Sequence, residues 1–264
     1  MRQFVTFSCE NNVLCGSLDN DTAQNGLLII SGGREPRFGP RRIMARLAQD
    51  LAQADIACFR FDRRGIGDSA GQDPGFEGAG PDIAAARTAY RAACPALKKL
   101  WLYGNCDAAT ALLLSLNMHD EPLILSNIWL GHAADAPPSA RQIRRNLIRK
   151  LGNAAAWRRL WTGQIQVRPL WQSLAPLWTR TAPAPLAHRI AAALSSVRRP
   201  VHILLSTGDR TALAFLEAWH SDAFRQTRGN PHIRITHIAT DSHSFTDAAG
   251  YAQLHDRLCA LLRG

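Results

Sequence analysis

The sequence predicts an α/β protein whose mostly parallel central sheet is covered by helices on both faces. Continuous apolar runs such as Leu27 to Ile30 are typical of strands that are buried on both faces. These runs alternate with segments of helical periodicity, which favours right-handed β-α-β crossovers. The chain has 264 residues, enough to bury an extensive core.

The predicted elements follow one another with short connections. Two alternating segments flank Asn11-Asn12 and predict an opening hairpin. We expect strands at residues 5–9, 13–18, 27–30, 56–61, 100–103, 123–129, 201–205 and 233–238. We expect helices at residues 42–54, 81–93, 106–116, 212–224 and 251–262, the second with Pro81 in its first turn.

Composition excludes several classes of protein. Hydrophobic residues make up 46% of the chain and charged residues 20%, as in ordinary globular domains. No apolar run approaches the roughly 18 residues of a membrane span, and the N-terminus lacks the apolar core of a secretory signal. The six cysteines contain no C-x-x-C pair, so free thiols in a cytoplasmic protein are expected.

The positive charge is concentrated in one segment. The net charge is +10, yet residues 136–208 contain twelve lysines and arginines and no acidic residue. Four of the seven tryptophans lie there as well. We interpret residues 136–196 as a helical lid inserted between two parts of one core, 1–135 and 197–264. Because the charge belongs to this expected lid, nucleic-acid binding is disfavoured.

The insert has two possible roles. Ile143, Leu147 and Leu151 share one helical face, while Arg141, Arg145 and Arg149 crowd another. Such a lid can simply bury its apolar face on the core and solvate its arginines. Alternatively, arginine interleaved with tryptophan suits an anionic substrate or the surface of an anionic membrane.

One strand–turn–helix segment has the features of a nucleophile elbow. The segment 100–111 runs from a strand directly into a helix, with Gly104 two residues before Cys106 and Ala108 two residues after it. Small flanking residues let a strained turn expose a nucleophile above the sheet, and a helix N-terminus favours a thiolate. The alternative is that Cys106 is a small buried residue in a tight turn.

An acid and a histidine follow in the order that such an elbow requires. Asp209 lies at the carboxyl end of the expected strand 201–205, and His243 lies between the last strand and the last helix. Asp209 can instead be a helix N-cap, and His243 a solvated loop residue. Asp241 is the competing acid, and His237 is the rival histidine within a strand.

Backbone donors for an oxyanion are also available. One would be the N–H of Asp107, next to the nucleophile, and the other the N–H of Gly33 or Arg34 after the first inner strand. No cofactor or metal is expected. The glycines at 65, 67 and 71 do not match a dinucleotide fingerprint, because the third comes one place late.

With these pieces in order, the chain resembles an α/β-hydrolase from end to end. The segment 61–69, with Asp62, Arg64 and Gly65, is similar to the D-x-R-G-x-G-x-S loop of many such enzymes, where its role is architectural. The cysteine elbow, the Gly32-Gly33 pair and the basic insert resemble the exosortase A system-associated hydrolase 1 group. That resemblance implies a bacterial enzyme, cytoplasmic or membrane-peripheral, with Cys106, Asp209 and His243 as its catalytic residues.

The expected function is hydrolysis of an ester or thioester through a Cys-His-Asp triad and a thioester acyl-enzyme. Cys106 and Ala108 depart from the common G-x-S-x-G motif, so ordinary esterase activity is in question. Acyl transfer to a saccharide or lipid-linked acceptor is one alternative, and a non-catalytic membrane-peripheral scaffold is another. The expected partners are an anionic small-molecule or lipid-linked acyl substrate and an anionic membrane, without nucleic acid.

Overall fold

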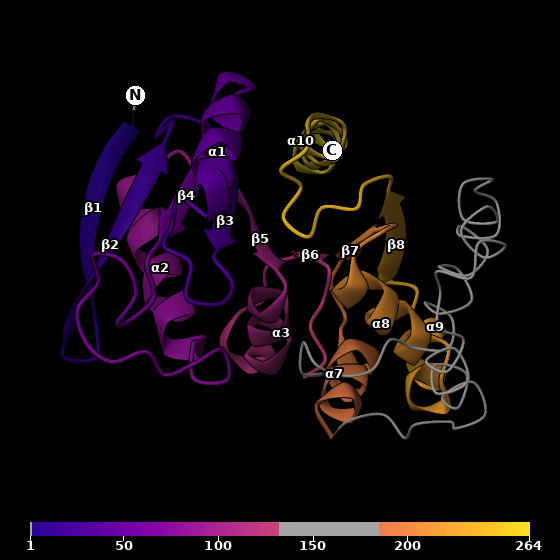
Figure 1. The fold of residues 1–264 in the computed structure, drawn as a ribbon. Coiled ribbons are helices and arrows are strands. Elements are labelled where there is room, and N and C mark those ends of the chain that lie inside the picture. Colours follow the sequence, from indigo (N-terminus) through magenta and orange to yellow (C-terminus); the bar gives the residue numbers. More distant parts are fainter. Residues whose placement is uncertain (1, 132–184) are drawn as a thin grey trace, which may run out of the picture. The chain divides into compact units, whose positions relative to one another are not determined.

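The computed structural model describes residues 2–131 and 185–264, of which 2–130 and 185–264 form one compact unit. Its centre is a sheet with the strand order β1-β2-β4-β3-β5-β6-β7-β8 (Figure 1). The strands are β1 Arg2–Cys9, β2 Asn12–Asp19, β3 Asn25–Ile30, β4 Ala57–Phe61, β5 Lys99–Asn105, β6 Leu123–Ser126, β7 Val201–Ser206 and β8 Ile233–Ile238. The predicted mostly parallel sheet is therefore confirmed.

The pairing of the strands shows where the strand order of the sheet reverses. β1 and β2 form the predicted hairpin, and β2 also pairs antiparallel with β4. All further neighbours are parallel, from the β4–β3 pair to the β7–β8 pair. The chain leaves β3 for β4 on one side and later returns to β5 on the other. Ligands of open α/β sheets bind at the carboxyl ends of strands beside such a reversal.

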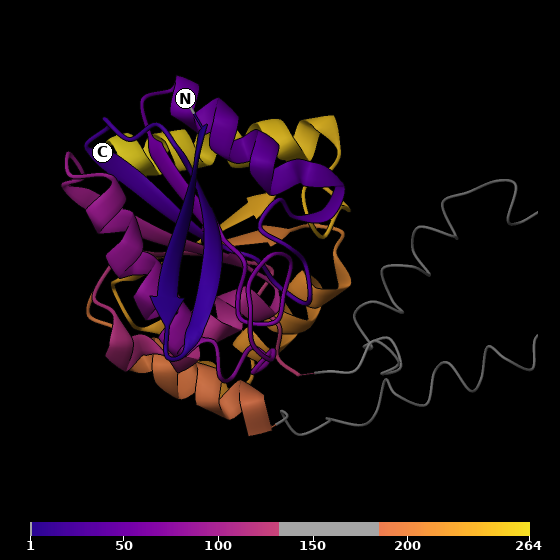
Figure 2. The same cartoon turned by 90° about the vertical axis from the view of Figure 1, so that its left-hand side faces the viewer.

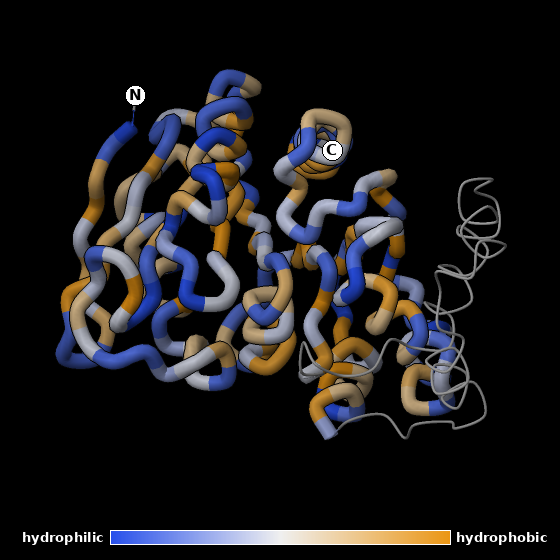
Figure 3. The backbone as a smooth tube through the Cα atoms, in the orientation of Figure 1, coloured by the Kyte–Doolittle hydropathy of each residue, from blue (hydrophilic) through white to orange (hydrophobic). Residues whose placement is uncertain are grey.

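Helices cover both faces of the sheet (Figures 1 and 2). One face carries α1 Ile43–Gln53 and α10 Ala248–Arg263, whose apolar side chains pack on Leu27, Ile29 and Tyr103. The other carries α2 Gly80–Ala93, α3 Asp107–Leu114, α7 Pro185–Ser196 and α8 Arg210–Trp219. The short helix α9 spans Arg225–Arg228. Apolar residues follow the inner strands in Figure 3, as burial on both faces requires.

Several elements begin or end at residues other than those predicted, among them the following three. The strand expected at 123–129 ends at Ser126, because Asn127 adopts a left-handed backbone with φ of 45°. The helix expected at 212–224 begins at Arg210 and ends at Trp219, and Asp222–Phe224 forms a separate 3₁₀ turn. The helix expected at 106–116 is shorter, since α3 covers Asp107–Leu114.

Helix α7 was not predicted as part of the core. The predicted insert extended to residue 196, whereas α7 buries Ala187, Ile190 and Leu194 in the same apolar core as α3 and α8. It packs against α3 and α9. This helix therefore belongs to the core unit and not to the insert. The rest of the predicted lid, including its arginines and tryptophans up to residue 184, lies outside the described residues.

Among residues 2–131 and 185–264, no helix has the length and apolar character needed to cross a bilayer. Within the same residues, no three histidine, cysteine or acidic side chains are grouped so as to hold a metal ion.

Candidate active site

Cys106 lies at a strained turn between β5 and α3. Its backbone has φ of 60° and ψ of −126°. This conformation is unfavourable in free energy for any residue other than glycine, and residues that adopt it cluster at functional sites. The turn needs a glycine before it, because a Cβ on Gly104 would lie 2.7 Å from backbone atoms of Ala108 and Ala109. Ala108 is itself buried, so both flanks are small. Cys106 remains half-exposed at the N-terminus of α3.

The structure brings Asp209, His243 and Cys106 together from three different loops. Asp209 follows β7, and His243 lies in the loop between β8 and α10. His243 Nδ1 lies 3.0 Å from Asp209 Oδ1, and Cys106 is close enough to His243 to contribute to the raised pKa of its imidazole. Since Nδ1 faces the carboxylate, Nε2 is the ring nitrogen left for the sulfur.

Asp209 is both the N-cap of a helix and the partner of His243, the two alternatives that its position allowed. Its Oδ2 accepts a hydrogen bond of 2.9 Å from the Ala212 N–H and so caps α8. Its Oδ1 faces His243. The competing acid, Asp241, is exposed and lies over Gly208, where a Cβ would be 1.5 Å from Asp241 Oδ1. His237 is exposed within β8.

The charged form of His243 is strongly favoured. The hydrogen bond to Asp209, followed by that to Cys106, raises the pKa of His243 from 6.5 to about 10, although partial burial opposes this change. His243 is therefore an imidazolium at neutral pH. In this form the imidazole can donate a proton but cannot accept one.

The raised pKa of His243 predicts how the free energy of unfolding depends on pH. A histidine whose pKa is raised on folding stabilises the native state fully below its unfolded pKa, near 6.5, and loses that contribution as the pH rises through about 10. The free energy of unfolding of wild type minus that of His243→Gln is thus expected to be constant below about pH 6 and to shrink toward pH 10. Urea titrations at a series of pH values measure it.

His237→Gln is the matched control, because this exposed histidine is in no ion pair among residues 2–131 and 185–264. Its difference from wild type should not follow the His243 profile. A His243→Gln difference that stays constant up to pH 10 would contradict the ion-pair interpretation.

A buried network of hydrogen bonds holds the loop that carries His243, and the sequence did not predict this network. Asn127 Nδ2 donates to the His243 carbonyl at 2.8 Å and to Ser206 Oγ at 3.1 Å, and Asn127 Oδ1 accepts from the Ser206 N–H. Ser206 Oγ donates to the Ser242 carbonyl, and Asn105 Nδ2 to that of His243. The available signal was an asparagine that interrupts an apolar run at the end of β6.

The expected oxyanion region lies between the elbow and the loop after β3. Gly32 is required there, because a Cβ would meet Asp107 Oδ1 at 2.6 Å and the Asn105 carbonyl at 2.7 Å. The Gly33 N–H, one of the expected oxyanion donors, donates to Asp107 Oδ1 at 2.6 Å. Arg34 is exposed, and Asp107 begins α3 next to Cys106. Sequence reasoning placed the two backbones together but did not foresee the carboxylate contact.

The loop after β4 supports this region from the other side. The Arg63 guanidinium donates to the Gly33 carbonyl. Asp62 accepts hydrogen bonds from the Asp68 N–H, at 3.0 Å, and from the Arg37 guanidinium. Ser69 Oγ donates to the Asp62 carbonyl at 2.7 Å. This segment therefore has an architectural place beside the site, holding the Gly33 peptide.

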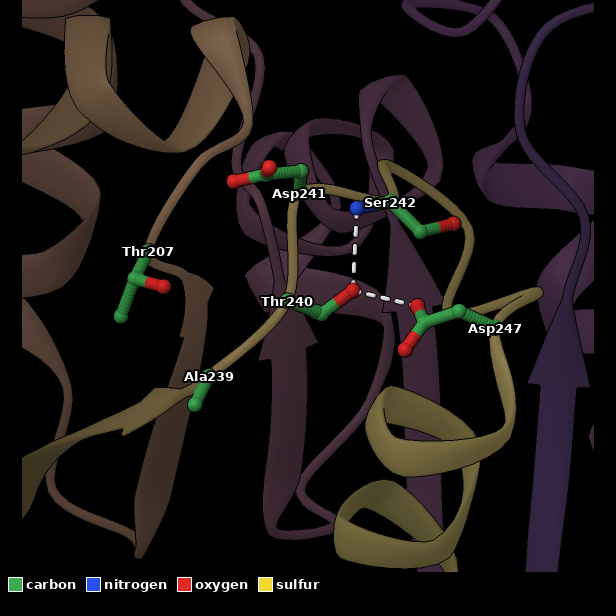
Figure 4. A pocket seen from close by; sticks show the side chains of 6 residues that line it. All are labelled: Thr207, Ala239, Thr240, Asp241, Ser242 and Asp247. Atoms are coloured by element: carbon green, nitrogen blue, oxygen red, sulfur yellow. Dashed lines mark hydrogen bonds between the residues drawn. The ribbon is translucent and has the colours of Figure 1, made fainter. Parts of the chain in front are cut away.

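A polar hollow of about 510 Å³ lies beside the loop that carries His243 (Figure 4). It is lined by Thr207, Ala239, Thr240, Asp241, Ser242 and Asp247. Thr240 Oγ1 accepts from the Ser242 N–H at 3.0 Å and donates to Asp247, which caps α10. Because Cys106 and His243 are not among the lining residues, we assign this hollow a supporting role for the loop and not substrate binding.

Four of the other cysteines are held in the thiol form. Burial raises the pKa of the Cys9 thiol to about 11, with a further contribution from its hydrogen bond to Asp82. Burial also raises the pKa of Cys58, Cys94 and Cys259. Cys15, half-exposed on β2, is the remaining rival for thiol reagents.

Comparisons with known proteins identify the fold. No family model matches the chain, and no curated protein matches it in sequence. Esterase Pf2001 of Pyrococcus furiosus is similar in structure, with a TM-score of 0.65 and 14% identity over 100% of this chain and 92% of that one. Dienelactone hydrolase of Anabaena variabilis has a TM-score of 0.60 and 15% identity, covering 98% and 95%.

A third similar structure is XC6422 of Xanthomonas campestris, described as an α/β serine hydrolase without a lid. Its TM-score is 0.53 and its identity 16%, covering 99% of this chain and 92% of that one. With identities this low, these likenesses speak for the fold alone. The chain has the α/β-hydrolase fold, as the sequence predicted.

Proposed function

We propose that the chain is a hydrolase of an ester or thioester in which Cys106 is the nucleophile, His243 its acid–base partner and Asp209 the residue that orients His243. The observation that carries this proposal is the ion pair of Asp209 with His243 beside Cys106, with the cysteine on a strained elbow. Proteins of the same fold that are named esterase and dienelactone hydrolase support the reaction class.

Acylation begins with the Cys106 thiolate. The sulfur attacks the carbonyl carbon, a C–S bond forms, and the carbonyl oxygen takes the negative charge. The N–H groups of Asp107 and of Gly33 or Arg34 are the proposed donors to this oxyanion. When the oxyanion collapses, the C–O or C–S bond to the leaving group breaks, and His243 Nε2 gives its proton to that group. The product is a thioester acyl-enzyme.

Deacylation reverses these roles. The neutral His243 takes a proton from water, the resulting hydroxide attacks the thioester carbonyl, and the Cys106 thiolate leaves beside the restored imidazolium. Asp209 stabilises the imidazolium in both half-reactions, as the raised pKa of His243 indicates. An alcohol in place of water would receive the acyl group instead, which is how the same site would act as an acyltransferase.

The proposed substrate class and cellular context rest on the resemblance to the exosortase A system-associated hydrolase 1 group. It favours a bacterial enzyme of exopolysaccharide-related metabolism, cytoplasmic or at the membrane periphery, that acts on a saccharide-linked or lipid-linked substrate. The basic segment 136–208 supports an anionic substrate, because an arginine-rich surface raises the local concentration of anions.

Intact mass spectrometry tests the proposal. After incubation with a panel of acyl esters and acyl thioesters, an adduct of acyl mass is expected on Cys106. Iodoacetamide at neutral pH should likewise label Cys106 ahead of the other five cysteines, and Cys15→Ser checks the half-exposed rival. A non-catalytic scaffold would give no acyl adduct and no preferential labelling of Cys106.

A further inference from the structure

The carboxylate of Asp107 occupies a backbone donor that acyl transfer would need. Asp107 Oδ1 accepts a hydrogen bond of 2.6 Å from the Gly33 N–H. The contact joins the first residue of α3 to the loop after β3, two segments that are 74 residues apart. Asp107 itself is half-buried, and within residues 2–131 and 185–264 no ion pair neutralises it.

This contact has the geometry of an internal oxyanion. A tetrahedral intermediate places its oxygen within about 2.7–3.1 Å of the donor N–H groups. The carboxylate oxygen lies 2.6 Å from the Gly33 nitrogen, slightly closer than that range, and it is a charged acceptor, which forms hydrogen bonds about twice as strong as a neutral carbonyl does. A substrate carbonyl cannot share this N–H without displacing the carboxylate.

The lack of a side chain at Gly32 makes room for the carboxylate at this place. A Cβ on Gly32 would approach Asp107 Oδ1 to 2.6 Å, so only glycine leaves room for the side chain here. The Gly33 carbonyl is held from the other side by the Arg63 guanidinium, and Arg63 is 4% exposed. Gly33 is thus held at its carbonyl by Arg63 and at its N–H by Asp107.

We propose that Asp107 is a built-in competitor for the oxyanion site, whose carboxylate must turn away from the Gly33 N–H before Cys106 can be acylated. This inference rests on the proposed function. Rotation about the Cα–Cβ bond of Asp107 frees the N–H and moves the carboxylate toward solvent, without changing the Asp107 backbone N–H that is the other proposed donor. In the resting enzyme the Gly33 donor is therefore occupied.

Two reagents separate the oxyanion site from the reactivity of the thiolate. Acylation by p-nitrophenyl acetate passes through an oxyanion, whereas alkylation by iodoacetamide is a displacement at carbon that forms none. The ratio of the two rate constants at Cys106 therefore reports on the oxyanion site. A change in the reactivity of the thiolate alters both rate constants, so it largely cancels from their ratio.

The variants are Asp107→Ala, Asp107→Asn and, as a control, Glu35→Gln. Asp107→Ala should raise the ratio about tenfold to a hundredfold, the range that a lost charge-assisted hydrogen bond represents. Asp107→Asn should raise it less, because a neutral amide oxygen still competes for the N–H. Glu35→Gln removes a charge from the same loop at an exposed side chain and should leave the ratio unchanged.

The outcomes separate this inference from the proposed function. A ratio that falls or stays constant in both Asp107 variants, while the wild type is acylated, overturns the inference alone and indicates that Asp107 positions the Gly33 loop. If iodoacetamide labels Cys106 in every variant and no ester acylates any of them, the proposed acyl transfer is overturned, and the inference with it. Asp107→Asn keeps the side-chain volume and covers the case in which Asp107→Ala does not fold.

Discussion

Replacing Cys106 by alanine is expected to abolish the acyl-enzyme adduct and to lower turnover by roughly 10⁴-fold or more, the scale on which loss of a nucleophile acts. The fold should survive. The cysteine is half-exposed and not packed in the core, and alanine leaves the crowded Gly104 and Ala108 contacts unchanged. Intact mass and steady-state turnover measure the chemical effect, and urea unfolding measures the structural one.

Cys106→Ser sharpens this result. A hydroxyl is a far weaker acid than a thiol and must give its proton to a neutral histidine as it attacks. Because the hydrogen bond to Asp209, the largest cause of the raised pKa of His243, is kept in this variant, the histidine still favours its protonated form, which cannot act as that base. The serine variant should therefore lie much closer to alanine than to wild type. Full turnover in the alanine variant would show that another residue is the nucleophile.

Local sequence signals sufficed where the structure depends on neighbouring residues. Apolar runs placed the inner strands, and the small residues on both sides of Cys106 marked the elbow, because both features follow from steric limits within a few residues. The order of acid and histidine along the chain placed Asp209 and His243 at adjacent strand ends, which the hydrogen bond between them now joins.

Local sequence patterns did not predict the contacts between segments that are distant in the chain. The apolar run 123–129 predicted a continuing strand, but Asn127 ends it in a left-handed turn and binds the carbonyl of His243, 116 residues away. The contact of Asp107 with Gly33 likewise depends on a side-chain torsion and on two loops that meet only in the fold. Helix α7 was assigned to the insert because its composition continues that of the basic segment, whereas its buried face decides its place.

The assignment of the acid leads to the second large effect, that of Asp209→Asn. In wild type the two carboxylate oxygens have separate tasks, since Oδ2 caps α8 at Ala212 and Oδ1 faces His243 Nδ1. Asparagine has only one oxygen for both. If that oxygen keeps the cap, the amide N–H group turns to His243 and forces Nδ1 to be the unprotonated acceptor, which places the remaining proton on Nε2, facing the sulfur.

This tautomer cannot accept a proton at Nε2 and has lost its neighbouring negative charge. We expect the pKa of His243 to fall below about 10 and turnover to drop by about 10³-fold to 10⁴-fold. The cap of α8 should be kept, because asparagine is as good an N-cap as aspartate, whereas the stabilisation that comes from the raised pKa of His243 should shrink. NMR titration of His243 and steady-state kinetics measure the two effects. The matched control is Asp241→Asn, at the exposed carboxylate over Gly208, which should remain near wild type. A larger loss in Asp241→Asn than in Asp209→Asn would reverse the assignment, since only the residue that faces Nδ1 can hold the imidazole in its working tautomer.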